Sequence, residues 1–235
     1  MTFTAPATPR GRYRRQSAIG ANRADLPPIH VMADHILSVY WKATRSERRQ
    51  GLTWYADARE VAAEVARVGD LPTVRHGAGV LAALSPQTDW HSNIGLAFDA
   101  AVAGTADDLP HFADACDKAT AVLSASDQPE NVLGGRKVRS FYANIYRPDR
   151  PGPVTVDRHA VAIALRGAAD SDRRSGNADA RLLERIGTYQ CVAAAFRGAA
   201  RSVGIHPHEM QAVTWVTWRR LTGADAADRT NREEF

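Results

Sequence analysis

Apolar side chains recur along most of the chain at the three- and four-residue spacing of a helix with one buried face. Segments with this pattern tend to begin at Pro or Asp and to end at Gly, as helices often do. No stretch of useful length alternates apolar and polar residues, as a half-buried strand would. The predicted helices cover approximately residues 29–43, 55–68, 72–84, 89–104, 108–123, 136–146, 155–167, 182–187, 188–203 and 207–223.

The remaining segments are predicted to connect these helices. We predict a polar connection over residues 45–53, a loop or single turn over 126–133, and a polar loop over 168–179. No internal repeat or linker divides the chain. We therefore predict a single all-α domain of about nine or ten helices over residues 27–223, with a basic, disordered arm over 1–26 and a charged tail over 224–235.

Composition narrows the class of protein. A chain of 235 residues is long enough for a large core. No apolar run approaches the length of a membrane span, and the start of the chain lacks a signal-peptide core, so we expect no membrane partner. Cys116 and Cys191 are the only cysteines, which excludes a disulfide framework and a four-cysteine metal or iron–sulfur site. A cytoplasmic setting, in a bacterial or phage-infected cell, is the expectation.

The charge distribution points to a polyanionic partner. The net charge is +4 and the sequence pI is about 9.3. Arginines cluster around Tyr13 and again after Thr44, and such basic segments bind phosphates through charge and counterion release. The alternative for the first cluster is a solvated tail. The arginines concerned are Arg10, Arg12, Arg14 and Arg15 in the arm, and Arg45, Arg48 and Arg49 in the second cluster.

Asp157 is the main candidate for chemistry. It lies in the segment Thr155-Val-Asp-Arg-His-Ala, where Pro151 and Pro153 forbid a helix upstream and an apolar helix follows. An acid at a helix start faces exposed backbone N–H groups and the positive end of the helix dipole, which favour a negative charge. Taken alone, these residues favour a simple N-cap.

A second segment, Ser85-Pro-Gln-Thr-Asp, precedes a helix, and a helix headed by Lys137 separates it from Val154-Thr-Val-Asp-Arg-His. In this order the motifs resemble those of the helix–hairpin–helix DNA glycosylases, the endonuclease III-like superfamily. The first is similar to that family's Ser-Ala-Gln-Ala-Thr-Asp type segment. The second resembles its Val-Asp-Thr-His segment, which holds the catalytic aspartate. The resemblance extends roughly from Val80 to Trp218.

The resemblance implies a DNA partner, a glycosylase-like helical domain and an enzyme that flips a modified pyrimidine out of DNA and cleaves its N-glycosidic bond. Asp157 would be the catalytic carboxylate, with His159 beside it, and Gln87 would enter the gap left by the flipped base. The alternatives are a half-buried helix histidine for His159 and an exposed loop amide for Gln87. The residues expected to contact nucleic acid are Gln87, Thr88, Trp90, His91, Lys137, Arg158, Arg12, Arg14 and Arg15.

The chain departs from the family pattern between the Lys137 helix and Asp157. The family carries a Leu-Pro-Gly-Val-Gly-type hairpin there, followed by the lysine that some members use as a Schiff-base nucleophile. Here the interval is Tyr146-Arg-Pro-Asp-Arg-Pro-Gly-Pro-Val, which has no room for a hairpin and no lysine. The pattern would therefore be that of a monofunctional enzyme without lyase activity.

This departure keeps other functions open. A shortened hairpin with Val-Asp-Arg-His retained is similar to phage-encoded glycosylase-like proteins of thymine hypermodification. Some of these are thymine pyrophosphorylases, which replace a pyrophosphate on a hydroxymethyl-pyrimidine with an amine. In that case Asp157 would act as a general base or stabilise the departing anion. A third interpretation is a DNA-binding protein that has lost the chemistry. The sequence leaves the oligomeric state open.

Other clusters are predicted to be structural. His206, His208 and Glu209 carry metal-type ligands, but His206 suits a helix cap and alternate histidines at a helix start are expected to diverge. We expect the last helix to bury Trp215 and Trp218 in the protein core. No CxxC motif, phosphate-binding Gly-rich loop or nucleophile elbow is present, so we expect neither a metal nor a cofactor.

Overall fold

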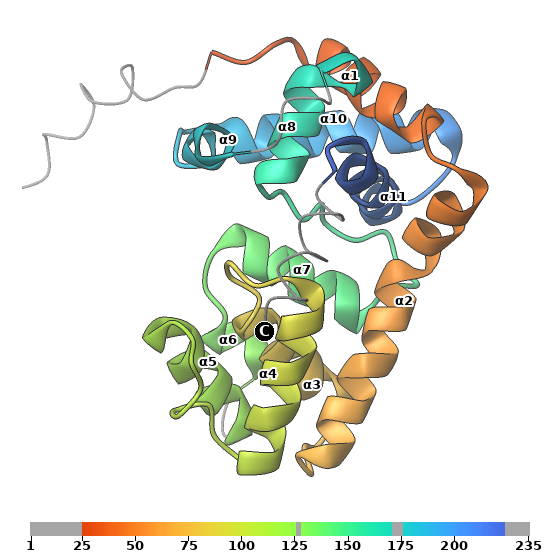
Figure 1. Cartoon of the computed structure of the whole chain (residues 1–235). Coiled ribbons are helices and arrows are strands. Elements are labelled where there is room, and N and C mark those ends of the chain that lie inside the picture. The colour runs from red at the N-terminus through yellow and green to blue at the C-terminus, as the bar shows by residue number, and fades with distance from the viewer. Residues whose placement is uncertain (1–24, 126–127, 171–175, 224–235) are drawn as a thin grey trace, which may run out of the picture.

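The computed structural model describes residues 25–125, 128–170 and 176–223. Within these ranges every regular element is a helix, which confirms the all-α prediction, and the helices form one domain (Figure 1). The elements are α1 (Ile29–Trp41), α2 (Arg45–Val68), α3 (Val74–Ala83), α4 (Trp90–Ala103), α5 (Ala113–Leu123), α6 (Pro129–Val132), α7 (Arg136–Tyr146), α8 (Arg158–Arg166), the 3₁₀ turn η1 (Ala168–Asp170), α9 (Asn177–Leu182), α10 (Thr188–Val203) and α11 (Pro207–Leu221).

The buried side chains form two clusters. One is built mainly on α2, α3, α4, α5 and α7, and the other on α1, α8, α10 and α11. The long helix α2 runs beside both groups and packs along α3 and α11 (Figure 1). Ala212 of α11 belongs to the first cluster, although Met210, Val213 and Trp218 of the same helix belong to the second. Helices α2 and α11 therefore join the two cores.

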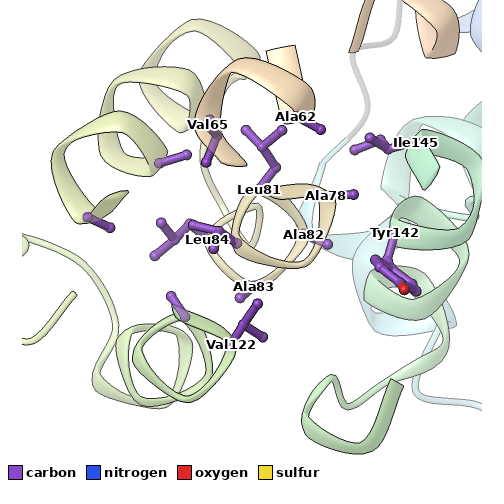
Figure 2. Close-up of a cluster of buried hydrophobic side chains, with 14 of the residues drawn as sticks. Ala62, Val65, Ala78, Leu81, Ala82, Ala83, Leu84, Val122, Tyr142 and Ile145 are labelled. Carbon is purple, nitrogen blue, oxygen red and sulfur yellow. The ribbon is translucent and has the colours of Figure 1, made fainter. Parts of the chain in front are cut away.

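Helix α3 is the centre of the first cluster. Every residue from His76 to Ala83 is buried, as expected for a helix with apolar residues on all sides. Figure 2 shows Leu81, Ala78 and Ala82 among side chains of α2 and α7. Gly77 lets α2 approach closely, because a Cβ there would lie 1.9 Å from the carbonyl O of Ala62.

Several predicted helix ends are confirmed. The Asp89 carboxylate accepts hydrogen bonds from the backbone N–H groups of His91 and Ser92 at 3.0 and 3.1 Å, so it caps α4. Gly104 ends that helix in the left-handed region, at φ 71°. Pro207 begins α11 as predicted, because proline needs no backbone N–H partner in the first turn.

The prediction of a polar connection over residues 45–53 is wrong, because α2 begins at Arg45. Thr44 and Glu47 form a capping box. The Glu47 N–H donates to Thr44 Oγ1 at 3.2 Å, and the Thr44 N–H donates to Glu47 Oε2 at 2.8 Å. Glu47 also pairs with Arg220 of α11 at 2.5 Å. The polar first turns of α2 are therefore held by a cap and by α11.

Two other helix boundaries differ from the prediction. Helix α5 begins at Ala113, five residues after Asp108, because residues 107–111 form turns and bends and Phe112 is the N-cap. The prediction of a short helix over 182–187 is wrong, because α9 ends at Leu182 and begins within the predicted polar loop. Buried Asp179 explains the earlier start, since its carboxylate accepts from the Gly176 N–H at 2.8 Å and pairs with Arg166 at 2.8 Å.

The predicted basic arm and charged tail lie mostly outside the described residues. Residues 1–24 and 224–235 are not described, so Arg12, Arg14 and Arg15 fall outside the structure. Among the helices that are described, none is long and apolar enough to cross a membrane.

Candidate functional site

A pocket opens where elements of the two core clusters meet. Its walls come from α2, α4, α7 and α11, from the connection between α3 and α4, and from the segment that leads into α8. The cavity has a volume of about 110 Å³. Four of the residues predicted from the sequence line it, although they come from three separate parts of the chain. They are Thr88, Trp90, Lys137 and Asp157.

Asp157 is both a helix cap and a pocket residue. The chain is extended at Asp157, and α8 begins at Arg158, just after the predicted start between Thr155 and Asp157. One carboxylate oxygen, Oδ1, accepts a hydrogen bond from the Ala160 N–H at 2.8 Å. This bond uses one of the helix's unpaired N–H groups and fixes the carboxylate at the pocket wall. The two interpretations of Asp157 as a cap and as a site residue are therefore compatible.

Hydrogen bonds from α2 and α7 anchor the segment before Asp157. The buried Tyr55 hydroxyl lies 3.1 Å from Thr155 Oγ1. Asn144 Nδ2 donates to the same Oγ1 at 3.2 Å and to the Pro153 carbonyl O at 2.9 Å. Burial raises the pKa of Tyr55 far above its ordinary value, so the hydroxyl stays neutral. The position of Asp157 is therefore fixed relative to both helices.

Tyr189 of α10 holds the same segment from the other side. Its hydroxyl lies 2.8 Å from the Val154 carbonyl O and 2.9 Å from Ser140 Oγ, and it accepts from the Val156 N–H at 3.3 Å. Burial raises the pKa of this phenol as well. Residues on both sides of Thr155 are therefore tied to the protein, which leaves little freedom for the carboxylate that follows.

Aromatic side chains form much of the pocket wall. The ring centroid of Trp54 lies 5.0 Å from that of Trp90, 5.9 Å from that of Phe141 and 6.2 Å from that of Trp215. These rings come from α2, α4, α7 and α11. Tyr55 adds a further ring, 6.3 Å from Phe141. Planar apolar surfaces of this kind suit a flat heterocyclic ligand.

The sequence prediction for the last helix is half right. Trp218 is fully buried in the second core cluster, as expected. Trp215 is only partly buried and lines the pocket, so the prediction that it belongs to the core is wrong. Trp54 was not predicted at all, because the helix that carries it was expected to begin only at Tyr55. Its position at the pocket depends on the packing of α2 against α11.

The segment Ser85-Pro-Gln-Thr-Asp lies beside the pocket. Gln87 is exposed and has a φ of 58°, a left-handed conformation that is uncommon for a residue other than glycine. Thr88 and Trp90 line the pocket, whereas Gln87 and His91 do not. The side chain of His91 is exposed on the first turn of α4. Strained backbone next to a pocket is typical of functional loops.

His159 and Arg158 begin α8 but do not line the pocket. Arg158 is exposed, and His159 is partly buried. Burial lowers the pKa of His159, and the nearby Asp157 carboxylate offsets part of this effect. Its Nδ1 is buried and has no hydrogen-bond partner among the described residues. His159 is therefore a neighbour of the Asp157 carboxylate rather than a pocket residue.

The histidines at the start of α11 have structural roles. His208 is 1% exposed, packs edge-on against Tyr55 and lies with Nε2 3.2 Å from the Pro148 carbonyl O. The rings of His206 and His208 stack 5.5 Å apart, so the prediction that they diverge is wrong. Glu209 accepts from the His206 N–H at 2.7 Å. Across the described ranges, no three His, Cys, Asp or Glu side chains gather in a way that could hold a metal ion.

The connection between α7 and α8 contains no hairpin helices. Helix α7 ends at Tyr146, and residues 147–157, all of them described, form a turn and an extended segment before α8. The sequence prediction that no hairpin fits in this interval is confirmed. Lys137, which heads α7, is the lysine that the fold brings to the pocket.

Comparison with known proteins identifies the family. The family model described as "Family of unknown function (DUF7178)" matches residues 22–222, so the chain belongs to this family. The match extends over all the helices and includes every residue that lines the pocket. Searches of curated proteins and of solved structures found no match.

Proposed function

We propose that the protein acts on a base in DNA, binding an extruded pyrimidine in the aromatic pocket and cleaving its N-glycosidic bond with Asp157 as the catalytic carboxylate. One observation carries the proposal: a carboxylate fixed by a helix cap borders a pocket whose walls are the rings of Trp54, Trp90, Phe141 and Trp215. Such a pocket suits a planar base, and the carboxylate suits a reaction that develops positive charge.

The proposed reaction breaks the bond between C1′ of the deoxyribose and the ring nitrogen of the base. The bonding electrons leave with the base, and positive charge develops on the sugar, as in glycoside hydrolysis. The Asp157 carboxylate stabilises this charge, and a water molecule adds to C1′ and releases a proton to the carboxylate or to solvent. The hydrogen bonds to Thr155 favour the reaction because they preorganise the segment that carries Asp157.

Contacts with the DNA backbone would come from basic residues at the pocket and at the start of α2. Lys137 lines it, and Arg158 is exposed beside Asp157. Arg45 and Arg49 are exposed on the first turns of α2, where Arg48 lies 4.7 Å from the ring centroid of Tyr40. Phosphate contacts of this kind position DNA and weaken with salt. Gln87, exposed next to the pocket, would enter the space left by the base.

One observation favours a second candidate function. The interval of residues 147–157 lacks the hairpin whose amides hold a phosphate in the glycosylases that the motifs resemble. A base-modifying transferase, similar to the thymine pyrophosphorylases, would use the same pocket without breaking the glycosidic bond. In such a reaction an amine displaces pyrophosphate from the hydroxymethyl carbon of the base, and Asp157 takes the proton that the amine loses.

Mass spectrometry after incubation with DNA distinguishes these functions. The substrates are duplex and single-stranded oligonucleotides that carry thymine, 5-hydroxymethyluracil or its pyrophosphorylated form, the last with and without an amine. A free base together with an abasic strand supports the glycosylase. An intact strand with an altered nucleoside, seen only when the amine is present, supports the transferase. If all strands remain unchanged although the protein binds them, the protein is a non-catalytic binder.

A further inference from the structure

Asn93 of α4 lies in the pocket wall with half of its amide paired. The residue is 2% exposed, and its Nδ2 donates to the Leu81 carbonyl O of α3 at 3.0 Å. The amide orientation follows from this contact, because the atom that faces a carbonyl oxygen must be the NH₂ group. The other atom, Oδ1, is therefore an acceptor.

Asn93 Oδ1 is buried and has no hydrogen-bond partner among the residues that the structure describes. A buried acceptor without a donor destabilises a protein, so a native fold rarely leaves one unpaired. Asn93 is one of the pocket's lining residues, and Trp90 lies three residues earlier on the same face of α4. A ligand that stacks on Trp90 would therefore lie beside Asn93, whose buried Oδ1 is an acceptor without a partner among the described residues.

Gln211 of α11 supplies a hydrogen-bond donor to the same pocket. It is 7% exposed, and its Oε1 lies 2.9 Å from the Tyr55 hydroxyl. Its Nε2 group makes no hydrogen bond to any described residue, although it carries two donors. The pocket wall thus combines an unpaired acceptor on Asn93 with an available donor on Gln211.

We propose that Asn93 and Gln211 recognise a pyrimidine edge on which an N–H donor lies next to an acceptor. Thymine and uracil present N3–H beside a carbonyl oxygen, and cytosine presents its amino group beside ring N3. In either case the donor is bound by Asn93 Oδ1 and the acceptor by Gln211 Nε2, while the rings of the wall hold the base plane. The inference rests on the proposed function in one respect, namely that a base occupies the pocket.

The test uses the fluorescence of the pocket tryptophans, Trp54, Trp90 and Trp215, which a stacked base quenches. Wild-type protein is titrated with single-stranded oligonucleotides that carry thymine, N3-methylthymine, cytosine or N4,N4-dimethylcytosine at one position, and with an abasic oligonucleotide. Methylation removes the donor and keeps the ring. We expect affinity for at least one of the unmethylated bases to exceed that for its methylated form roughly ten-fold or more.

The pair that shows the difference identifies the base. Asn93→Leu is expected to abolish the preference for the unmethylated base, whereas Asn131→Leu, at an exposed asparagine of α6, keeps it. Thermal melting checks that both variants are folded, and the wild-type comparison stands even if Asn93→Leu fails to fold. Equal affinities within both pairs, or no quenching beyond that of the abasic oligonucleotide, would overturn the proposal.

This outcome is separable from that of the proposed function. Discrimination between methylated and unmethylated bases without cleavage or modification would support recognition by Asn93 and remove the catalytic proposal. Cleavage of both forms at equal rates would support the catalytic proposal and remove the role of Asn93.

Discussion

The Tyr55 hydroxyl lies 3.1 Å from Thr155 Oγ1 and so connects α2 to the segment that carries Asp157. The two residues are 100 positions apart in the chain, and both line the pocket. Tyr55 also contacts Gln211 of α11, so a single buried hydroxyl links three of the elements that form the candidate site.

Tyr55→Phe is expected to lower the free energy of unfolding by about 1–3 kcal/mol, because it removes a buried hydroxyl that has two partners. Any catalytic rate should fall as well, since the Thr155 segment loses an anchor. Chemical denaturation measures the first effect. The matched control is Tyr146→Phe, because the Tyr146 hydroxyl makes no hydrogen bond to a described residue. If the two variants were equally stable, the Tyr55 contacts would not contribute to stability.

The close approach of α2 and α11 is expected to depend on Gly51. A Cβ at this position would lie 2.4 Å from the Val213 Cα, so the helices must move apart in Gly51→Ala. We expect a loss of about 1–3 kcal/mol in the free energy of unfolding. Gly95→Ala on α4 is the control, because a Cβ there meets nothing within 4 Å. That variant should gain about 0.5–1 kcal/mol from helix propensity. If Gly51→Ala and Gly95→Ala changed the free energy of unfolding equally, this would contradict the close packing of α2 against α11 at Gly51.

The stability of the fold is expected to decrease as the pH falls, in part through His208. Burial lowers the pKa of this imidazole below its ordinary value of 6.5. As the pH drops below 6.5, the unfolded chain binds a proton that the folded protein resists, so the free energy of unfolding decreases until the pH reaches the folded pKa. At higher pH both states are neutral and this effect disappears.

His208→Gln should therefore lose less stability than the wild type between about pH 7.5 and pH 5.5. The comparison uses the change in the free energy of unfolding with pH rather than its value at one pH. The reason is that His208→Gln itself lowers stability by removing the contact with Tyr55. His159, whose pKa burial also lowers, remains in both proteins. An unchanged pH dependence would show that His208 does not resist protonation in the folded state.

Lys137 is expected to contact a phosphate. Lys137→Gln should weaken binding to DNA of any sequence and reduce the slope of log affinity against log salt by about 1. Fluorescence anisotropy at several salt concentrations measures both quantities. Lys118→Gln is the control, because Lys118 of α5 does not line the pocket and pairs with Asp114. If Lys118→Gln reduced the slope as much as Lys137→Gln, the contact would not be specific to the pocket.

The sequence predicts the parts of the site whose causes are local. Prolines at 151 and 153 exclude a helix there, which places the start of the next helix between Thr155 and Asp157, and the structure has Asp157 as its cap. Asp89 is predicted for the same reason. Thr44 and Glu47, which cap α2, have the spacing of a capping box, a local signal for a helix start. The segment after Thr44 is so polar that a loop is predicted there instead, although one face of this helix packs on α11.

The residues that sequence analysis missed have no local signal. Trp54, Asn93 and Gln211 belong to helices far apart in the chain, and they meet only because α2 packs along α3 and α11. Asn93 is an ordinary polar residue in an apolar helix, and neither its place in the pocket lining nor its unpaired amide oxygen has a signal in the sequence. Tertiary packing decides which helical residues face a shared cavity, and periodicity alone does not contain that information.

The central claim is that the charge of Asp157 drives the reaction, and Asp157→Asn tests it. Asparagine can still accept from the Ala160 N–H, so the cap should lose about 1 kcal/mol or less. The missing negative charge should cost several kcal/mol of transition-state stabilisation, roughly two or more orders of magnitude in rate. Asp99→Asn, at an exposed position of α4, is the control and should keep the parental rate.

The most direct measurement is the single-turnover rate at which the folded Asp157→Asn protein releases or alters the base of the substrate identified by mass spectrometry. We predict a rate at least about a hundred-fold below the wild type, with DNA affinity equal to it or higher, because removing an anion near the phosphates favours binding. A rate close to that of the wild type would contradict the account and remove Asp157 from the mechanism.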